Sequence, residues 1–471
     1  MFLSRNGFAA LFTLLFLAGC THKNVFNPNG GYDLNQAFKH DIEQADAASQ
    51  GQWWTVYKDE TLNALIETAF DTNPNLSQIR ARLDQATAIS VQNRAPLFPT
   101  VTLDGSRSRT TSGSGQALGF FVTGSEFALQ GAASYELDIW GGNTASFNSS
   151  KASEAAAQED IYASKITLSA SIVEAWLTIL SLHVQENLIR SQIDTNETIL
   201  SLQERRFELG GATALDILQQ EEQLALSQAS LPDIVSAKEQ ALNNLIVLIG
   251  QDARSEFSFE DTDFPAPLPI PNAGLPSDLL VNRPDVRSAW LRLISADWAV
   301  NAAYADRLPS FNLSSVLSAR QRSLDGIFEA WLLDLAASVS LPLIDGGLRR
   351  GAVQQALGFT EEQYHAYRET VLGAVIDVEN ALVANTYQDE RLRAVESQLN
   401  TSRQTLERAQ SSYANGSATY LNVLTSLNNV QALEQLLQQE RLTQSLERVA
   451  LYRALGGRAW AKDDEVKRDA E

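Results

Sequence analysis

The 471-residue sequence has a single cysteine, so it cannot form an internal disulfide bond. It is also poor in basic residues, with 36 lysines and arginines against 57 acidic residues and a net charge of -21. Proteins that bind nucleic acids normally carry a basic surface, so this charge argues against that class. After residue 20, no run approaches the ~20 consecutive apolar residues of a transmembrane helix. If the chain crosses a membrane, it must therefore do so with strands.

The N-terminus has the pattern of a secretory signal peptide. It reads MFLSRNGFAALFTLLFLAGC, with Arg5 in a short basic start and an apolar stretch that begins at Phe8. The ending LAGC resembles a bacterial lipobox, which would make Cys20 the lipidated first residue of the mature chain. The alternative is an ordinary signal peptide with a coincidental cysteine. Thr21 after the cysteine indicates sorting to the outer membrane.

The sequence contains an internal repeat. Four pairs of positions correspond, in the same order and at nearly constant separation: Pro74 with Pro284, Gly141 with Gly346, Gly210 with Gly416, and Gly250 with Gly456. Each half reads as a helix, two alternating segments, a double glycine, a very long helix, a glycine turn and a second long helix. The five prolines between Phe264 and Pro276 predict an extended connector between the halves.

Four segments alternate apolar and polar residues with the period of two that is typical of β-strands. They run over residues 97–106, 126–140, 309–319 and 331–343. A soluble sandwich with one wet face is the alternative, but these segments are longer than the usual ~5–6-residue strand. Together with the lipobox, they favour an outer-membrane barrel with its apolar residues outside.

Four strands cannot close a barrel, and an open sheet in lipid would leave backbone N–H and C=O groups unpaired at its edges. The barrel would therefore be shared between copies of the chain. Two copies would give eight strands and a filled interior, whereas three would give twelve strands and a lumen. The polar residues that share one face are candidates to line it. They are Asp104, Gln130, Glu136, Asp138, Asn312 and Asp334.

Long helices account for most of the rest of each half. Residues 143–209 contain no proline and carry apolar residues at the seven-residue spacing of coiled coils. At 1.5 Å per residue, this helix would be about 100 Å long. Its counterpart is expected over 348–412, with shorter partners over 212–249 and 417–455. The helix over 74–95, stacked on 212–249, would form a composite helix of equal reach. A solid bundle fits the same heptads, but coupling to a membrane barrel favours a hollow tube.

Double glycines and glycine turns punctuate these helices. Gly210-Gly211 and Asn415-Gly416 are expected turns between antiparallel helices, where glycine adopts positive φ at low cost. These turns would lie farthest from the membrane, at the natural place for a gate and for docking a partner. Gly141-Gly142 and Gly346-Gly347 are expected to turn the chain from barrel wall to tube wall.

Catalytic and metal-binding motifs are missing from the sequence. The four histidines lie in no ligand-spaced cluster, and there is no zinc motif, Walker loop, GxGxxG or GxSxG. Glu136 and Asp138 could form a carboxylate pair, but on one strand face they are more simply residues that line the lumen. We therefore expect no enzymatic activity, and no cofactor other than a covalent lipid on Cys20.

Several blocks of the sequence are distinctive. They are WWTVYKDETLNALIETAFDTNPNL from Trp53, LPSDLLVNRPDVRSAWLRLISADWAVNAAYADRLPSFNL from Leu275, YELDIWGG, SLPLIDGGLR and LYRALGGRAW. These blocks resemble the outer membrane factors, the TolC- and OprM-type efflux lipoproteins. The resemblance implies a trimer with a twelve-stranded outer-membrane β-barrel, four strands per chain, above a twelve-helix periplasmic α-barrel and a mixed equatorial region.

Together, the signal pattern, the internal repeat and the resemblance predict six segments. They are a signal peptide (1–19), a lipidated N-terminal and equatorial segment (20–72), a first repeat (73–250), a proline-rich connector (251–276), a second repeat (277–456) and a C-terminal equatorial tail (457–471).

Members of that family often carry charged residues on the inner tip helix that hold the periplasmic end shut. Here the second turn reads SYANGSATYLNVLT, with Ala418, Asn422 and Thr425 where such charges are common. Asp216 is retained in the first half. Tyr413, Asn422 and Thr425 either form a weaker, polar latch or are solvated turn residues. The gate candidates are Gly210, Gly211, Asp216, Tyr413, Gly416, Asn422 and Thr425.

The implied function is the passive exit duct of a tripartite efflux system for drugs or small solutes. The chain would act as a homotrimer, lipid-anchored in the outer membrane and extending into the periplasm. Its partners would be a periplasmic adaptor and a proton-driven inner-membrane pump, with no nucleic acid. The alternatives are the exit duct of a type I protein secretion system and a structural periplasm-spanning lipoprotein that conducts nothing.

Overall fold

The computed structural model describes residues 26–40, 52–113, 121–252, 254 and 264–456. They divide into two compact units. Unit 1 contains Arg82–Gln158, Ser288–Arg368 and the described residues up to Gly30. Unit 2 contains Gly31–Ala81, Glu159–Arg287 and the described residues from Glu369 onwards.

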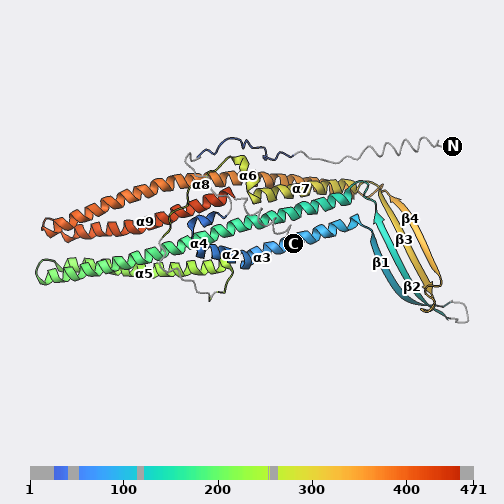
Figure 1. Ribbon diagram of the computed structural model, residues 1–471, viewed down its shortest axis with the longest axis horizontal. Helices are drawn as coiled ribbons and strands as arrows, with labels where there is room; N and C mark the ends of the chain where they lie inside the picture. The colour runs from blue at the N-terminus through green and yellow to red at the C-terminus, as the bar shows by residue number, and fades with distance from the viewer. Residues whose placement is uncertain (1–25, 41–51, 114–120, 253, 255–263, 457–471) are drawn as a thin grey trace. The chain divides into compact units, whose positions relative to one another are not determined.

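The elements follow one another in the order that the repeat predicts (Figure 1). They are η1 (Trp53–Tyr57), α2 (Glu60–Thr72), α3 (Pro74–Arg94), η2 (Ala95–Leu97), β1 (Thr100–Gly113), β2 (Phe121–Glu136), α4 (Gly142–Glu208), α5 (Ala214–Ile249), α6 (Pro276–Asn282), α7 (Pro284–Ala305), β3 (Ser310–Gln321), β4 (Trp331–Ser340), α8 (Leu348–Ala414) and α9 (Tyr420–Leu455). Helices α4 and α8 have 67 residues each, and α5 and α9 have 36 each. The two halves therefore share one architecture, as a duplicated sequence requires.

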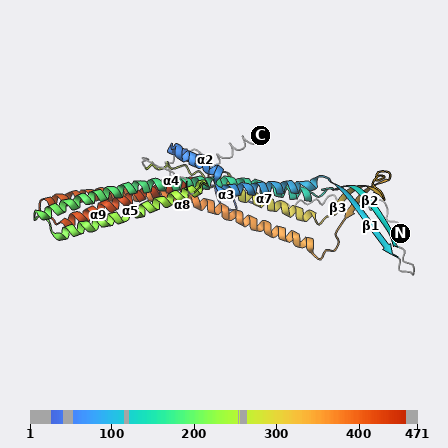
Figure 2. The same cartoon turned by 90° about the horizontal axis from the view of Figure 1, so that it is seen from below.

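Unit 1 carries a four-stranded antiparallel sheet in the order β1-β2-β3-β4 (Figures 1 and 2). The two halves meet at its centre, where β2 pairs with β3 from Phe127 opposite Gln321 to Glu136 opposite Asn312. Strand β1 begins only at Thr100, after the prolines at the end of α3, because proline has no N–H for a strand ladder. It continues to Gly113, beyond the expected end at residue 106.

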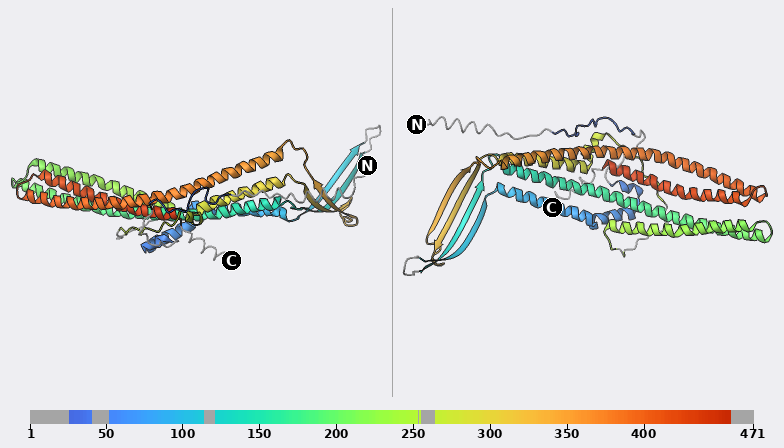
Figure 3. Two further views of the ribbon diagram at one scale, coloured as in Figure 1. Left: turned by 90° about the horizontal axis from the view of Figure 1, so that it is seen from above. Right: turned by 180° about the vertical axis from the view of Figure 1, so that it is seen from behind.

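Unit 2 contains two antiparallel helical hairpins, α4 with α5 and α8 with α9 (Figure 3). Apolar residues at heptad-like spacing pack inside the second hairpin, where Val395 and Leu399 of α8 meet Val430, Leu433 and Leu437 of α9. Among the described helices, α4 alone is long and apolar enough to cross a membrane by composition. However, 61% of its apolar stretch is buried inside the structure. Burial against other helices therefore explains that composition.

The start of α3 abuts the end of α5 within unit 2. The Thr72 hydroxyl donates to the carbonyl of Ile249 at 2.5 Å, and the Asn73 side-chain amide donates to that of Leu248 at 2.7 Å. The chain leaves α5 through Gly250, where a Cβ would lie 2.4 Å from the Thr72 carbonyl oxygen. This is the end-to-end contact that a composite helix needs. Residues 264–275 of the connector contain no helix, as their prolines predict.

Candidate functional site

The polar residues expected to line a lumen share one face of the sheet, with one exception. Asp104 lies directly opposite Gln130 in the β1–β2 ladder, and Glu136 lies opposite Asn312 in the β2–β3 ladder. Asp334 lies opposite a β3 residue with the same parity as Asn312, so it belongs to this face too. That this face lines a lumen stays a prediction.

The exception is Asp138. Its expected place on the strand is wrong, because β2 ends at Glu136. The Asp138 carboxylate instead caps the start of α4. It accepts the Asn143 N–H at 3.0 Å, the Thr144 N–H at 2.8 Å and the Thr144 hydroxyl at 2.6 Å. The first N–H groups of a helix have no partner within the helix, and a carboxylate is their best acceptor.

The double glycines lie at the two strand-to-helix junctions. Gly141 and Gly346 have φ of 74° and 64°, and Gly347 has φ of 93°. A Cβ on Gly142 would lie 2.9 Å from that of Ala305, so this position also needs glycine for space. Before α8, Asp345 accepts the Gly347 N–H at 2.9 Å and that of the second residue of α8 at 3.2 Å. These backbone bonds, Gly347 first, hold the pKa of Asp345 below its ordinary value.

The two tip turns are built alike. Gly210 and Gly416 both have φ of 73°. The following N–H bonds back into the preceding helix, from Gly211 to the Arg206 carbonyl at 2.7 Å and from Ser417 to the Ser412 carbonyl at 2.9 Å. Only glycine adopts this left-handed conformation without strain, which explains why both repeats place it here.

Asp216 and Asn422 both make local contacts at the start of a tip helix. Asp216 and Thr213 form a capping box: the Thr213 N–H donates to the Asp216 carboxylate at 2.8 Å, and the Asp216 N–H donates to the Thr213 hydroxyl at 3.2 Å. In the second repeat, the Thr419 hydroxyl donates to the Asn422 carbonyl at 2.7 Å. Asn422 and Thr425 also line an exposed groove of about 500 Å³ between α8 and α9. A gate role for Asp216, Asn422 or Thr425 stays a prediction.

Tyr413 is the gate candidate that contacts the other hairpin of the same chain. Its hydroxyl donates to the Gln203 side chain at 3.1 Å, and the Arg206 guanidinium lies 4.3 Å from its ring centre. Its ring lies 5.6 Å from that of Tyr420. Tyr420 is buried and donates to Gln220 of α5. Burial raises the pKa of Tyr420 above its ordinary value. Both tyrosines therefore join the two hairpins through hydrogen bonds that their hydroxyls donate.

An amide ladder that the sequence reasoning missed continues this contact along the helices. Asn196 of α4 has no exposed surface. Its amide donates to the Ser227 hydroxyl at 2.9 Å, and its carbonyl accepts from Gln431 of α9 at 3.2 Å. Gln435 donates to Gln192 at 2.9 Å in the same ladder.

The signal for this ladder was present in the heptads. Ile189, Asn196 and Gln203 follow one another at the seven-residue spacing of the apolar seam. The seam of α4 thus changes from apolar to amide toward the tip. Buried amides need hydrogen-bond partners, so these side chains specify the register of the packed helices as well as holding the helices together.

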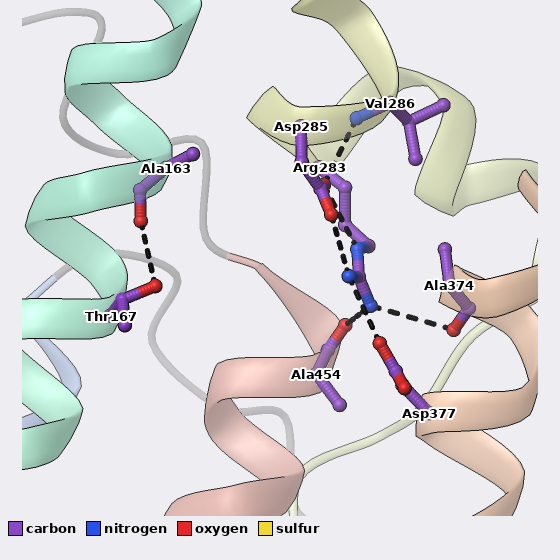
Figure 4. Close-up of polar contacts among 8 residues, drawn as sticks. All are labelled: Ala163, Thr167, Arg283, Asp285, Val286, Ala374, Asp377 and Ala454. Atoms are coloured by element: carbon purple, nitrogen blue, oxygen red, sulfur yellow. Dashed lines mark hydrogen bonds and ion pairs between the residues drawn. The ribbon is translucent and has the colours of Figure 1, made fainter. Parts of the chain in front are cut away.

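Arg283 was also missed, at the junction of α9 with α7 (Figure 4). It donates to Asp285 at 2.7 and 3.1 Å, to Asp377 of α8 at 3.2 Å and to the Ala454 carbonyl near the end of α9 at 2.9 Å. Burial opposes its charge, but Asp285 and Asp377 more than offset that effect, so the pKa of Arg283 lies above its ordinary value.

Arg283 and Asn73 occupy equivalent places in the two repeats. Each precedes the proline that begins the next helix, and each donates to a carbonyl in the last turn of the final long helix of its own repeat, which is α5 for Asn73 and α9 for Arg283. Asn73 also accepts the Leu76 N–H at 2.9 Å. One junction therefore uses a neutral amide where the other uses a cation held by two carboxylates.

Both repeats match one family. The family model described as outer membrane efflux protein covers residues 65–251 and 275–457. The chain belongs to the outer membrane efflux protein family. This is a family of outer-membrane channels, not of enzymes.

Relatives and solved structures agree with this assignment. The efflux protein is 31% identical to the pyoverdine export outer membrane protein OpmQ of Pseudomonas aeruginosa, over 89% of this chain and 90% of the relative. It is 27% identical to the toluene efflux pump outer membrane protein TtgF of Pseudomonas putida, over 86% and 85%. The outer-membrane channel OprN matches with a TM-score of 0.85 at 26% identity, over 93% of this chain and 99% of that one.

The fold class expected from the sequence is thereby confirmed. It is the fold of the trimeric outer-membrane channels, with four barrel strands and two long helical pairs per chain. Cys20 lies outside the described residues, so its lipid stays a prediction, as do the six segment boundaries.

Proposed function

We propose that three copies of this chain form the exit duct of a tripartite efflux system, which passively conducts drugs or small solutes across the outer membrane. The observation that carries this proposal is the pair of sheet edges. Strands β1 and β4 each have one paired neighbour among the described residues. Unpaired backbone groups in lipid cost several kcal/mol each, so other copies must supply the missing partners. Three copies give twelve strands and a lumen.

The rest of the proposal follows from this architecture. A lipid on Cys20 adds an anchor to the barrel. The hairpin tips dock a periplasmic adaptor, and a proton-driven inner-membrane pump supplies the energy for transport through the passive duct. The relatives are named for pyoverdine export and toluene efflux. Those names support a cargo of small organic compounds rather than the polypeptides of a type I secretion system.

The first experiment combines native mass spectrometry of the full chain in mild detergent with conductance in planar bilayers. A trimer that conducts ions is expected. A monomer would overturn the shared barrel, and a trimer without conductance would favour a structural lipoprotein. Asp104→Asn should reduce the preference for cations over anions, because it removes a wall charge. Asp252→Asn removes the same charge outside the sheet and should leave selectivity unchanged.

A second experiment addresses the cargo. Deleting the gene should raise the cellular accumulation of small organic dyes, and the intact gene should restore their efflux. Loss of a secreted polypeptide without any change in dye accumulation would favour the type I secretion duct instead.

A further inference from the structure

The face of the sheet opposite the lumen-lining candidates is apolar over five successive rows of residues across the strands. From the helix end outward, its side chains are Phe311 and Val339; Tyr135, Leu313 and Ala337; Val101, Ala133, Ser315 and Leu335; Leu103, Gly131, Leu317 and Leu333; and Gly105, Leu129, Ala319 and Trp331. On β3 this band runs from Phe311 to Ala319, about 27 Å at ~3.3 Å per residue. At the ~40° tilt of barrel strands it spans about 20 Å of membrane, close to the ~25 Å apolar band of such barrels.

Two arginines break the pattern immediately beyond the band. Arg107 shares the next row with Phe127 and Gln321, and Arg109 shares the row after that with Ser125. Counted from Gly105, they lie about 5 and 10 Å above the band at the same strand rise and tilt. The two arginines lie at the end of the sheet remote from the helices of unit 1. If the apolar face meets lipid, this end lies at the level of the lipid head groups of the outer leaflet.

Neither arginine is paired with a carboxylate in the described chain. The Arg107 guanidinium lies 5.2 Å from the Phe127 ring centre. This cation–π contact attracts the guanidinium but does not neutralise its charge. Both arginines are exposed. Residues 114–120, which lie between β1 and β2 in the sequence, read SGQALGF and include no acidic residue. Two positive charges in a chain of net charge -21 are therefore exposed without a carboxylate partner among the described residues.

We propose that Arg107 and Arg109 form a binding site for the phosphate groups of lipids in the outer leaflet of the outer membrane. The inference rests on the proposed function, because it takes the apolar face as the lipid face. A guanidinium binds phosphate with two parallel N–H donors, and arginines two apart on one strand face present two such forks side by side. Phe127 and Trp331 at the border of the band supply the aromatic girdle that flanks barrel interfaces. Bound lipid would fix the depth of the barrel in the membrane.

Arg320 provides a matched control. Arg320 lies opposite Ala128, at the same end of the sheet but on the face that carries the lumen-lining candidates. Arg109→Gln and Arg320→Gln therefore remove the same charge from opposite faces of the sheet, in rows three residues apart along the strands. The probe is lipid A carrying two phosphates, titrated into the full-length trimer in detergent and counted as bound adducts by native mass spectrometry. Lipid A with one phosphate and phosphatidylethanolamine serve as comparison lipids, and inorganic phosphate as a competitor.

The double variant Arg107→Gln/Arg109→Gln should bind two-phosphate lipid A at least tenfold more weakly. Arg109→Gln should weaken binding about threefold, and Arg320→Gln should leave it within twofold. Wild type should prefer the two-phosphate form, and inorganic phosphate should compete weakly. Unchanged affinity in the double variant, or equal losses in Arg109→Gln and Arg320→Gln, would overturn the site.

A carboxylate of a second copy is the alternative partner of these arginines. Glu329, just before β4, would be its source, because β4 would adjoin β1 of the next copy in a closed barrel. In that case Glu329→Gln and the double variant would both dissociate the trimer, which would also overturn the lipid site. Conductance measured on the same samples separates the two proposals. A conducting channel with unchanged lipid affinity overturns only the lipid site, whereas a wild type without conductance overturns the proposed function.

Discussion

Replacing Arg283 with methionine keeps an unbranched apolar stem but shortens the side chain and removes its charge and all of its donors. The guanidinium side chain is 12% exposed, and it joins the start of α7 to α8 and to the end of α9. Breaking a fully buried ion pair costs ~3–5 kcal/mol. Here Asp285 and Asp377 are 40% and 57% exposed, so water reaches them once the cation is gone. We therefore expect Arg283→Met to cost about 2–3 kcal/mol, in the range for hydrogen bonds to charged groups.

Hydrogen exchange in the intact trimer measures this cost locally. The loss should appear as a roughly 30- to 150-fold fall in the protection of amides in the last turn of α9, because each 1.4 kcal/mol is a factor of ten. The matched control is Arg453→Met in the last turn of α9, next to Ala454, because the Arg453 side chain is 42% exposed and pairs with Glu174 at 3.1 Å. It should change protection about fivefold or less. Asn73→Ala should lower the protection of amides in the last turn of α5. The size of this fall should lie between those of the two arginine variants, because a neutral helix cap contributes ~0.5–2 kcal/mol.

Two results would refute this reasoning. If Arg283→Met changes protection no more than Arg453→Met, the cation does not hold the junction. If its effect spreads evenly over α7, α8 and α9, the variant lowers global stability and the arginine has no local role.

Three further predictions concern other contacts. Asn196→Ala should destabilise the protein by about 1–3 kcal/mol, because it leaves the buried partners of Asn196 without a hydrogen bond. The double variant Asn196→Leu/Gln431→Leu should cost less than the sum of the two single changes. Additive losses in denaturant unfolding would contradict the ladder. Asn422→Asp should raise the closed fraction of single channels if the tip is a gate, and unchanged conductance and closed fraction would argue against a gate there. Lys238, then Arg190, holds the pKa of Glu186 below its ordinary value of 4.5. The resulting stability is present above pH 4.5 and lost as the pH falls through the lower folded pKa, so Glu186→Gln should be less stable than wild type at pH 7. This difference should shrink as the pH falls below 4.5, and a difference in melting temperature that stays constant with pH would contradict this.

The sequence determined the local features of this protein. The repeat, the two-residue alternation of the strands and the seven-residue spacing of the long helices are periodicities of neighbouring residues, so they need no tertiary information. Glycine at the tips was equally readable, because positive φ at Gly210 and Gly416 is a property of a single residue. Strand parity correctly placed Asp104, Gln130, Glu136, Asn312 and Asp334 on one face.

Only the tertiary structure decided the partners. The pairing of β2 with β3 joins segments from different halves, and no local pattern specifies which strand lies next to which. Asp138 changed from a lumen-lining candidate to a cap because β2 ends at Glu136, shortly before α4, and the unpaired N–H groups of that helix attract its carboxylate. Arg283 and Asn196 acquire their roles from helices far away in the sequence. A long polar side chain has many possible partners, and packing alone selects among them.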